Sequence, residues 1–171
     1  MKTHFILSTM LLVMFSITIQ AQQGKFAVNP DGEKDLAAAN EYMKAIQSKD
    51  PSQIEKIHAS NVVGYGPSWN SPRNHQQIVE AFINIWESVS DFRYDRVRMI
   101  PVTVSGDEIP EYNGNWVMTW SVFVGKDRTT GIEVMIDLHE TLKIDKGKII
   151  MKVTYYNELD AMIQTGQYPG D

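Results

Sequence analysis

The stretch GIEVMIDLHETLKI, residues 131–144, decides the fold class. Its side chains alternate: Ile132, Val134, Ile136, Leu138, Leu142 and Ile144 fall on one side, and mostly polar or charged residues fall on the other. A period of two over this length predicts a β-strand with one buried face and one solvated face. Glu140 is the exception, because it sits between leucines on the apolar side.

The strand pattern extends in both directions from this stretch. Residues 92–104 and 116–124 also show a period of two, as expected for β-strands. DKGK at 145–148 is typical of a hairpin turn. Residues 148–157 return as a further strand, and residues 158–166 predict a short helix that Gly166 stops. These long neighbouring strands predict a mostly antiparallel sheet.

The N-terminal half has a helical period instead. Leu36, Ala39, Met43 and Ile46 repeat at helical spacing. Residues 50–59 predict a second helix with Asp50 as its cap, and residues 75–89 predict a third, with Asn74 and Gln77 at its start. The sequence therefore predicts an α+β protein, in which a curved, mostly antiparallel sheet wraps around three helices and a short C-terminal helix follows.

Composition and charge restrict the function. The chain has 171 residues, no cysteine and a net charge of −5, with no run of lysines and arginines. This balance argues against nucleic acid or an anionic membrane as a partner. The basic start MKTH, the apolar run Phe5–Ile19 and Ala21 together predict a signal peptide of residues 1–21. We expect an exported protein, periplasmic or secreted, without a stable membrane anchor after cleavage near Ala21.

Three motifs resemble those of a known family. They are YGPSWNSPRNHQQIVEAF at 65–82, LKIDKGKI at 142–149 and YYNELDAMIQTG at 155–166. In this order and spacing they resemble the SnoaL-like group of the nuclear transport factor 2-like superfamily, named after polyketide cyclases. The resemblance implies a cone-shaped domain with an internal cavity, and often a homodimer through the sheet. Members often carry His at the position of Glu140 and Asp at that of Asn157, so this chain departs from the pattern at both.

The expected organisation has three parts. Residues 1–21 are the signal peptide, residues 22–35 are a flexible lead-in, and residues 36–171 form a single SnoaL-like domain. The fold alone does not select a function, because isomerases, cyclases, hydrolases and transport modules all use it.

Glu140 is the candidate catalytic residue. A carboxylate among apolar side chains loses solvation, so it must be protonated or hydrogen-bonded. Such a carboxylate in a cavity is suited to moving a proton next to a carbonyl group. The alternative is a structural role, in which a buried donor such as a tyrosine hydroxyl satisfies Glu140.

Aromatic residues supply the candidate ligand pocket. Tryptophan and tyrosine combine apolar area with a hydrogen-bond donor, although each one could equally fill the core. The predicted pocket residues are Tyr42, Tyr65, Trp69, Trp116, Trp120, Tyr155 and Asn157. Trp116 and Trp120 are expected on the inner face of one strand, and Tyr155 and Asn157 on that of another.

The sequence predicts no metal and no cofactor, because it has no metal-ligand spacing and no phosphate-binding glycine loop. Two functions stay open. One is proton-transfer chemistry of the isomerase, cyclase or dehydratase type on a small, mostly apolar ligand, using Glu140. The other is a non-catalytic ligand-binding or dimeric assembly module of the same fold.

Overall fold

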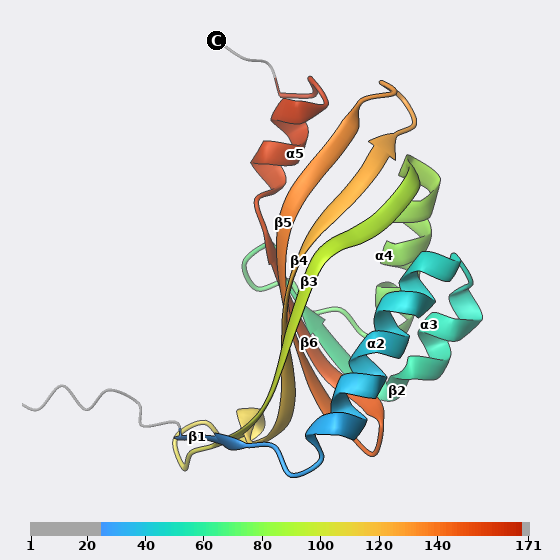
Figure 1. Cartoon of the computed structure of the whole chain (residues 1–171). Helices are drawn as coiled ribbons and strands as arrows, with labels where there is room; N and C mark the ends of the chain where they lie inside the picture. Colours follow the sequence, from blue (N-terminus) through green and yellow to red (C-terminus); the bar gives the residue numbers. More distant parts are fainter. Residues whose placement is uncertain (1–24, 169–171) are drawn as a thin grey trace, which may run out of the picture.

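The computed structural model describes residues 25–168, which form a curved sheet with helices against one face (Figure 1). The sheet has six strands in the order β1-β3-β4-β5-β6-β2. All neighbouring strands are antiparallel except β2 and β6, which are parallel. The strands are β1 (Lys25–Val28), β2 (His58–Tyr65), β3 (Val89–Ser105), β4 (Gly114–Asp127), β5 (Glu133–Asp145) and β6 (Lys148–Tyr156). The predicted α+β class is confirmed.

Three helices lie on the concave side of the sheet, and a fourth follows the last strand (Figure 1). They are α2 (Gly32–Ser48), α3 (Pro51–Ile57), α4 (His75–Ser88) and α5 (Glu158–Gln164), with a short 3-10 turn, η1 (Pro110–Tyr112). The hydrophobic core lies between α2, α3, α4 and the inner face of the sheet, and we refer to the opposite face as the outer face.

The helix starts follow the capping residues that the sequence predicts. Asn74 accepts a hydrogen bond from the Gln77 backbone N–H while the Gln77 side chain accepts one from the Asn74 N–H, which completes a capping box at α4. Asp50 accepts from the Ser52 N–H at the start of α3. Gln53 donates to the Asp50 side chain instead of its backbone, so the second box is not reciprocal.

Two bulges in β3 contribute to the bend of the sheet. The pairing of β3 with β4 shifts between Ser90 and Arg93 and again between Asp95 and Arg98. Asp91 and Arg96 have φ values of 51° and 53°, the left-handed conformation found in such bulges. Because a bulge bends its strand and increases its twist, this end of the sheet leaves room for a cavity under the helices.

The predicted flexible lead-in over residues 22–35 is wrong for its described part. Lys25–Val28 pairs with Val102–Ser105 as the edge strand β1, and α2 already begins at Gly32. All four residues of β1 are exposed, so no buried periodicity marks the strand in the sequence. The predicted signal peptide, residues 1–21, lies outside the described residues.

Candidate functional site

Glu140 lies on the inner face of β5, as its alternation predicts. Its side chain is buried, with 2% of the residue exposed. One oxygen, Oε1, accepts hydrogen bonds from the Tyr42 hydroxyl at 2.9 Å and the Thr154 hydroxyl at 3.1 Å, and lies 3.1 Å from the Lys152 amine. Donors from α2 and β6 therefore converge on a single carboxylate oxygen.

Lys152 is the cation of this cluster. It pairs with Leu142 across β5 and β6, which places it on the inner face beside Glu140. Its Nζ donates to the Tyr42 hydroxyl at 2.6 Å. The same nitrogen lies 5.1 Å from the ring centre of Tyr42 and 4.9 Å from that of Phe82, within range of cation–π attraction. Glu140, Lys152, Tyr42 and Thr154 form what we call the Glu140 cluster.

The second oxygen of Glu140 differs from the first. Oε2 is buried and has no hydrogen-bond partner among the described residues. The hydroxyl of Thr119, which faces Glu140 across β4 and β5, is likewise unpartnered within this part of the chain. A buried acceptor without a donor is costly, and such a group calls for an explanation. Oε2 of Glu140 is therefore available to accept a proton.

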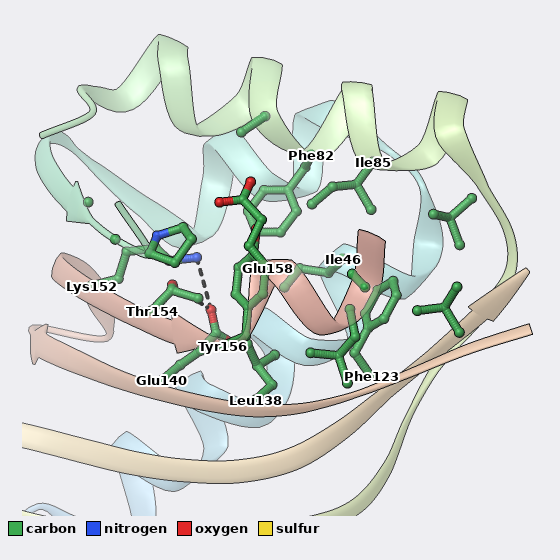
Figure 2. Close-up of a pocket in the computed structure, with 18 of the residues that line it drawn as sticks. Ile46, Phe82, Ile85, Phe123, Leu138, Glu140, Lys152, Thr154, Tyr156 and Glu158 are labelled. Atoms are coloured by element: carbon green, nitrogen blue, oxygen red, sulfur yellow. Dashed lines mark hydrogen bonds and ion pairs between the residues drawn. The ribbon is translucent and has the colours of Figure 1, made fainter. Parts of the chain in front are cut away.

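A pocket of about 350 Å³ opens beside the Glu140 cluster (Figure 2). Its wall is mostly apolar, with Glu140, Lys152 and Thr154 forming one polar end. Residues from α2, α4, α5 and the strands contribute, among them Ile46, Phe82, Ile85, Phe123, Ile136, Leu138, Tyr156, Ala161 and Met162. An apolar cavity with a few convergent polar groups is the usual form of a small-molecule site.

Burial sets the protonation of the groups around the cluster. Desolvation raises the pKa of Tyr42 well above its usual value, and the nearby Glu140 charge raises it further. The same two causes raise the pKa of Tyr94, which lines the pocket. Burial lowers the pKa of His58 from 6.5 to about 4. Near neutral pH both tyrosine hydroxyls therefore keep their protons, and His58 is uncharged.

Three of the predicted pocket residues point the other way. Thr119 pairs with Glu140, so Trp116 and Trp120 lie on the outer face of β4, and Tyr155 pairs with His139 on the outer face of β6. The prediction for β4 is wrong because its outer face is the more apolar one, whereas its inner face carries Thr119 and Ser121. On β6 the register shifts near Ile149, and this shift reverses the expected alternation.

The remaining predicted residues have different positions. Asn157 caps α5 by accepting from the Asp160 N–H, so it does not line the inner pocket.

Tyr65 lines the inner pocket and also a second hollow on the outer face of the sheet, which we call the outer groove. Trp69 lines only the outer groove and is 96% exposed. Tyr42 is fully buried and contacts Glu140, although it is not part of the pocket wall. Trp116 and Tyr155 line the outer groove.

Sequence reasoning missed the inner-face residues of β6. Lys152, Thr154 and Tyr156 all line the pocket, yet the alternation assigned them to the solvent side. A lysine and a threonine in a strand are ordinary signs of a solvated face. The one available signal was Glu140 itself, because a buried carboxylate requires a donor or cation on a neighbouring strand.

The fold and the pocket together define the class of protein. A curved sheet that encloses a cavity with helices is the nuclear transport factor 2-like, or ketosteroid isomerase-like, architecture. A family profile described as a SnoaL-like domain matches residues 39–151. The chain belongs to the SnoaL-like family. No curated protein matches the sequence significantly.

Solved structures share this fold at low sequence identity. An LEH-like epoxide hydrolase from M. tuberculosis is 14% identical, with a TM-score of 0.57 over 81% of this chain and 93% of that one. IdmH, a proposed polyketide cyclase from Streptomyces antibioticus, is 15% identical, with a TM-score of 0.62 over 77% and 98%. A ketosteroid isomerase-like protein from Catenulispora acidiphila, solved with trimethylamine, is 10% identical, with a TM-score of 0.61 over 78% and 97%.

Two further observations concern residues 25–168 only. No helix in this range is long and apolar enough to cross a membrane. Within the same range, no three His, Asp or Glu side chains lie close enough together to hold a metal ion.

Proposed function

We propose that this protein binds a small, mostly apolar carbonyl compound in the inner pocket and that Glu140 moves a proton on it. The observation that carries the proposal is the asymmetry of the carboxylate. Three donors hold Oε1, while Oε2 is buried beside the pocket with no partner among residues 25–168. A carboxylate that is fixed by one oxygen and unpartnered at the other is arranged to accept a proton.

The surrounding residues support this chemistry. The pocket wall beside Glu140 is mostly apolar, and a carboxylate held at hydrogen-bond distance from a bound ligand is a usual general base for a weakly acidic C–H group. Tyr42 remains a donor near neutral pH because its pKa is raised, so it positions Glu140 without competing for the proton. The reaction class is proton transfer next to a carbonyl, as in isomerisation, cyclisation or dehydration.

A nitrobenzisoxazole tests the base without knowledge of the natural substrate. Removal of its ring C–H proton by a carboxylate breaks the N–O bond and releases a coloured cyanophenolate. We expect turnover by the wild type, and Glu140→Gln should lower its rate by about 100-fold or more while binding stays within a modest factor.

The matched control is Glu133→Gln, which makes the same change at an exposed position of β5. It should leave the rate unchanged. Equal rates for the wild type and Glu140→Gln would exclude Glu140 as the base.

A second candidate function is ligand binding without catalysis. The observation in its favour is the satisfaction of Oε1 by Tyr42, Thr154 and Lys152, since a buried ion pair also occurs in purely structural roles. In that case a small apolar ligand should bind the wild type and Glu140→Gln equally, and neither should turn over the probe. Solved structures of the same fold include an LEH-like epoxide hydrolase and a protein in complex with trimethylamine, so the fold accommodates both outcomes.

A homodimer through the outer face of the sheet is also part of the proposal. Large apolar side chains are exposed there, including Phe26, Ile100, Trp120 and Tyr155. Trp120 stacks on His139 with 4.9 Å between ring centres, and His139 stacks on Tyr155 at 6.3 Å. Contiguous exposed apolar surface of this kind favours association with a second copy.

Export after cleavage near Ala21 completes the proposal. It rests on the basic start and the apolar run of about 15 residues, short of the ~20 that span a bilayer. The intact mass of the protein purified from its native host decides the question, and a mass that retains residues 1–21 would contradict export by cleavage.

A further inference from the structure

Lys152 is distinct among the lysines of residues 25–168. It is the only buried one, with 8% of the residue exposed. Its amine lines the apolar pocket, whereas lysines such as Lys126 and Lys146 are exposed. Proton transfer by Glu140 requires no amine in the pocket, so the proposed function leaves this group without a chemical role.

The geometry around the amine is that of a nucleophile with its own acid and base. Nζ lies 3.1 Å from Glu140 Oε1 and 2.6 Å from the Tyr42 hydroxyl, and the rings of Tyr42 and Phe82 flank it. Figure 2 shows the amine directed at the Glu140 carboxylate at the polar end of the pocket. Glu140 Oε1 is close enough to Nζ to take a proton from Lys152, and this transfer leaves a neutral amine and a carboxylic acid.

We propose that Lys152 forms a covalent imine with an aldehyde or ketone bound in the inner pocket. The neutral amine attacks the carbonyl carbon to give a carbinolamine. Protonated Glu140 then gives its proton to the carbinolamine hydroxyl, which leaves as water. The net change converts a carbonyl compound and the lysine ammonium into a protonated imine and water, and Glu140 ends as a carboxylate.

The imine would give Lys152 and Glu140 successive roles in one reaction. A protonated imine withdraws electrons from the adjacent carbon more strongly than the parent carbonyl does, so the neighbouring C–H becomes easier to deprotonate. The regenerated Glu140 carboxylate lies beside that nitrogen and can remove the proton. The inference rests on the pocket and carboxylate of the proposed function and narrows the substrate class to aldehydes and ketones.

Reductive trapping on the wild-type protein tests this inference. Benzaldehyde is the probe, and cyanoborohydride supplies a hydride to the imine carbon, which leaves a stable benzyl-lysine. Proteolysis and peptide mass mapping then give the labelling rate of each lysine. We expect Lys152 to be labelled at least about tenfold faster than exposed Lys146, because a desolvated amine with an adjacent base is an activated nucleophile.

Three variants show which residues cause the fast labelling. Lys152→Arg should abolish the fast labelling, whereas Lys148→Arg, on the same strand but exposed, should leave it unchanged. Glu140→Gln keeps the amine but removes its proton acceptor, and should slow labelling of Lys152 by about 100-fold.

Labelling of Lys152 that is absent, or no faster than that of Lys146, would overturn the inference, and this result comes from the wild type without any variant. The two proposals fail separately. If Glu140→Gln loses benzisoxazole turnover while Lys152 stays unlabelled, only the imine fails. If Lys152 is labelled rapidly and the benzisoxazole is not turned over, only the Glu140 base fails.

Discussion

At the scale of single residues, the Glu140 cluster shows how a charge is kept inside an apolar layer. Burying an ion costs several kcal/mol, which a well-placed counter-ion and hydrogen bonds only roughly offset. Lys152 provides the counter-ion, and Tyr42 and Thr154 provide the hydrogen bonds. A buried ion pair of this kind adds little net stability to the fold, so stability alone does not explain why the cluster is present. This supports a chemical role for it.

Removing the counter-ion should be costly. Lys152→Met leaves a buried carboxylate uncompensated, and we expect the free energy of unfolding to fall by about 3–5 kcal/mol. The double variant Lys152→Met, Glu140→Leu removes both charges and should recover most of that loss. Urea unfolding measures the stability of the single and the double variant, with exposed Lys126→Met as the control. A single variant as stable as this control would show that the pair contributes only as a surface pair does.

His58 should make stability depend on pH. The pKa of His58 is about 4 in the folded protein, against 6.5 for a solvated histidine as in the unfolded chain, because burial disfavours the charged ring. Between these values the unfolded chain binds a proton that the folded chain does not, so stability falls as the pH falls. The contribution is fully present above pH 6.5, and its loss by pH 4 amounts to about 3 kcal/mol.

Urea unfolding of the wild type and His58→Leu over this pH range checks the prediction. Carboxylates titrate in both proteins, so the difference between the two curves isolates His58. Curves that run parallel from neutral pH to pH 4 would contradict the assignment.

At the scale of elements, α4 connects local sequence to the site. Its inner side supplies Ile78, Phe82 and Ile85 to the pocket wall, and its first turn is held by the capping box at Asn74. The helix position therefore depends on a feature that is local in sequence. On the sheet side the opposite holds, because bulges and register decide which residues of β4 and β6 face inward.

Loss of the cap should weaken the fold measurably. Asn74→Ala removes the hydrogen bond to the Gln77 N–H, and we expect a loss of about 1 kcal/mol in the free energy of unfolding. Asn84→Ala makes the same change at an exposed position inside α4, where alanine favours helix, so it should be neutral or stabilising. Equal effects of the two changes in denaturant unfolding would show that the cap contributes nothing.

At the scale of the whole molecule, the two faces of the sheet differ in character. The inner face holds the pocket and the Glu140 cluster, and the outer face carries stacked aromatic rings from β4, β5 and β6. A homodimer through the outer face would cover those residues and leave the inner pocket unchanged.

A charge on the outer face should disrupt that dimer. Trp120 is 41% exposed, and Trp120→Glu places a carboxylate at the centre of the apolar surface. Light scattering after size exclusion should give a dimer mass for the wild type and a monomer mass for this variant. Leu159→Glu, at a similarly exposed position on α5, is the control and should stay dimeric. A monomeric wild type would contradict the dimer directly.

The sequence by itself determined the helices, the four long strands β3 to β6 and the burial of Glu140, whereas the exposed edge strand β1 left no pattern in it. Residues 131–144 alternate against a clearly polar opposite face, so the parity of β5 could be assigned without a partner strand. The same reasoning failed on β4, because its outer face carries Trp116, Met118 and Trp120 while its inner face buries Thr119 and Ser121. Hydrophobicity assigns the wrong face when the outer side of a strand is the more apolar one.

Only the tertiary structure decided the identity of the site. A register shift near Ile149 turns Lys152, Thr154 and Tyr156 inward, and the parallel pairing of β6 with β2 fixes their place beneath α4. Tyr42 reaches Glu140 across 98 positions of sequence. Contacts of this kind depend on strand register and helix packing, which are long-range properties, whereas periodicity reports only which neighbours along the chain share a face.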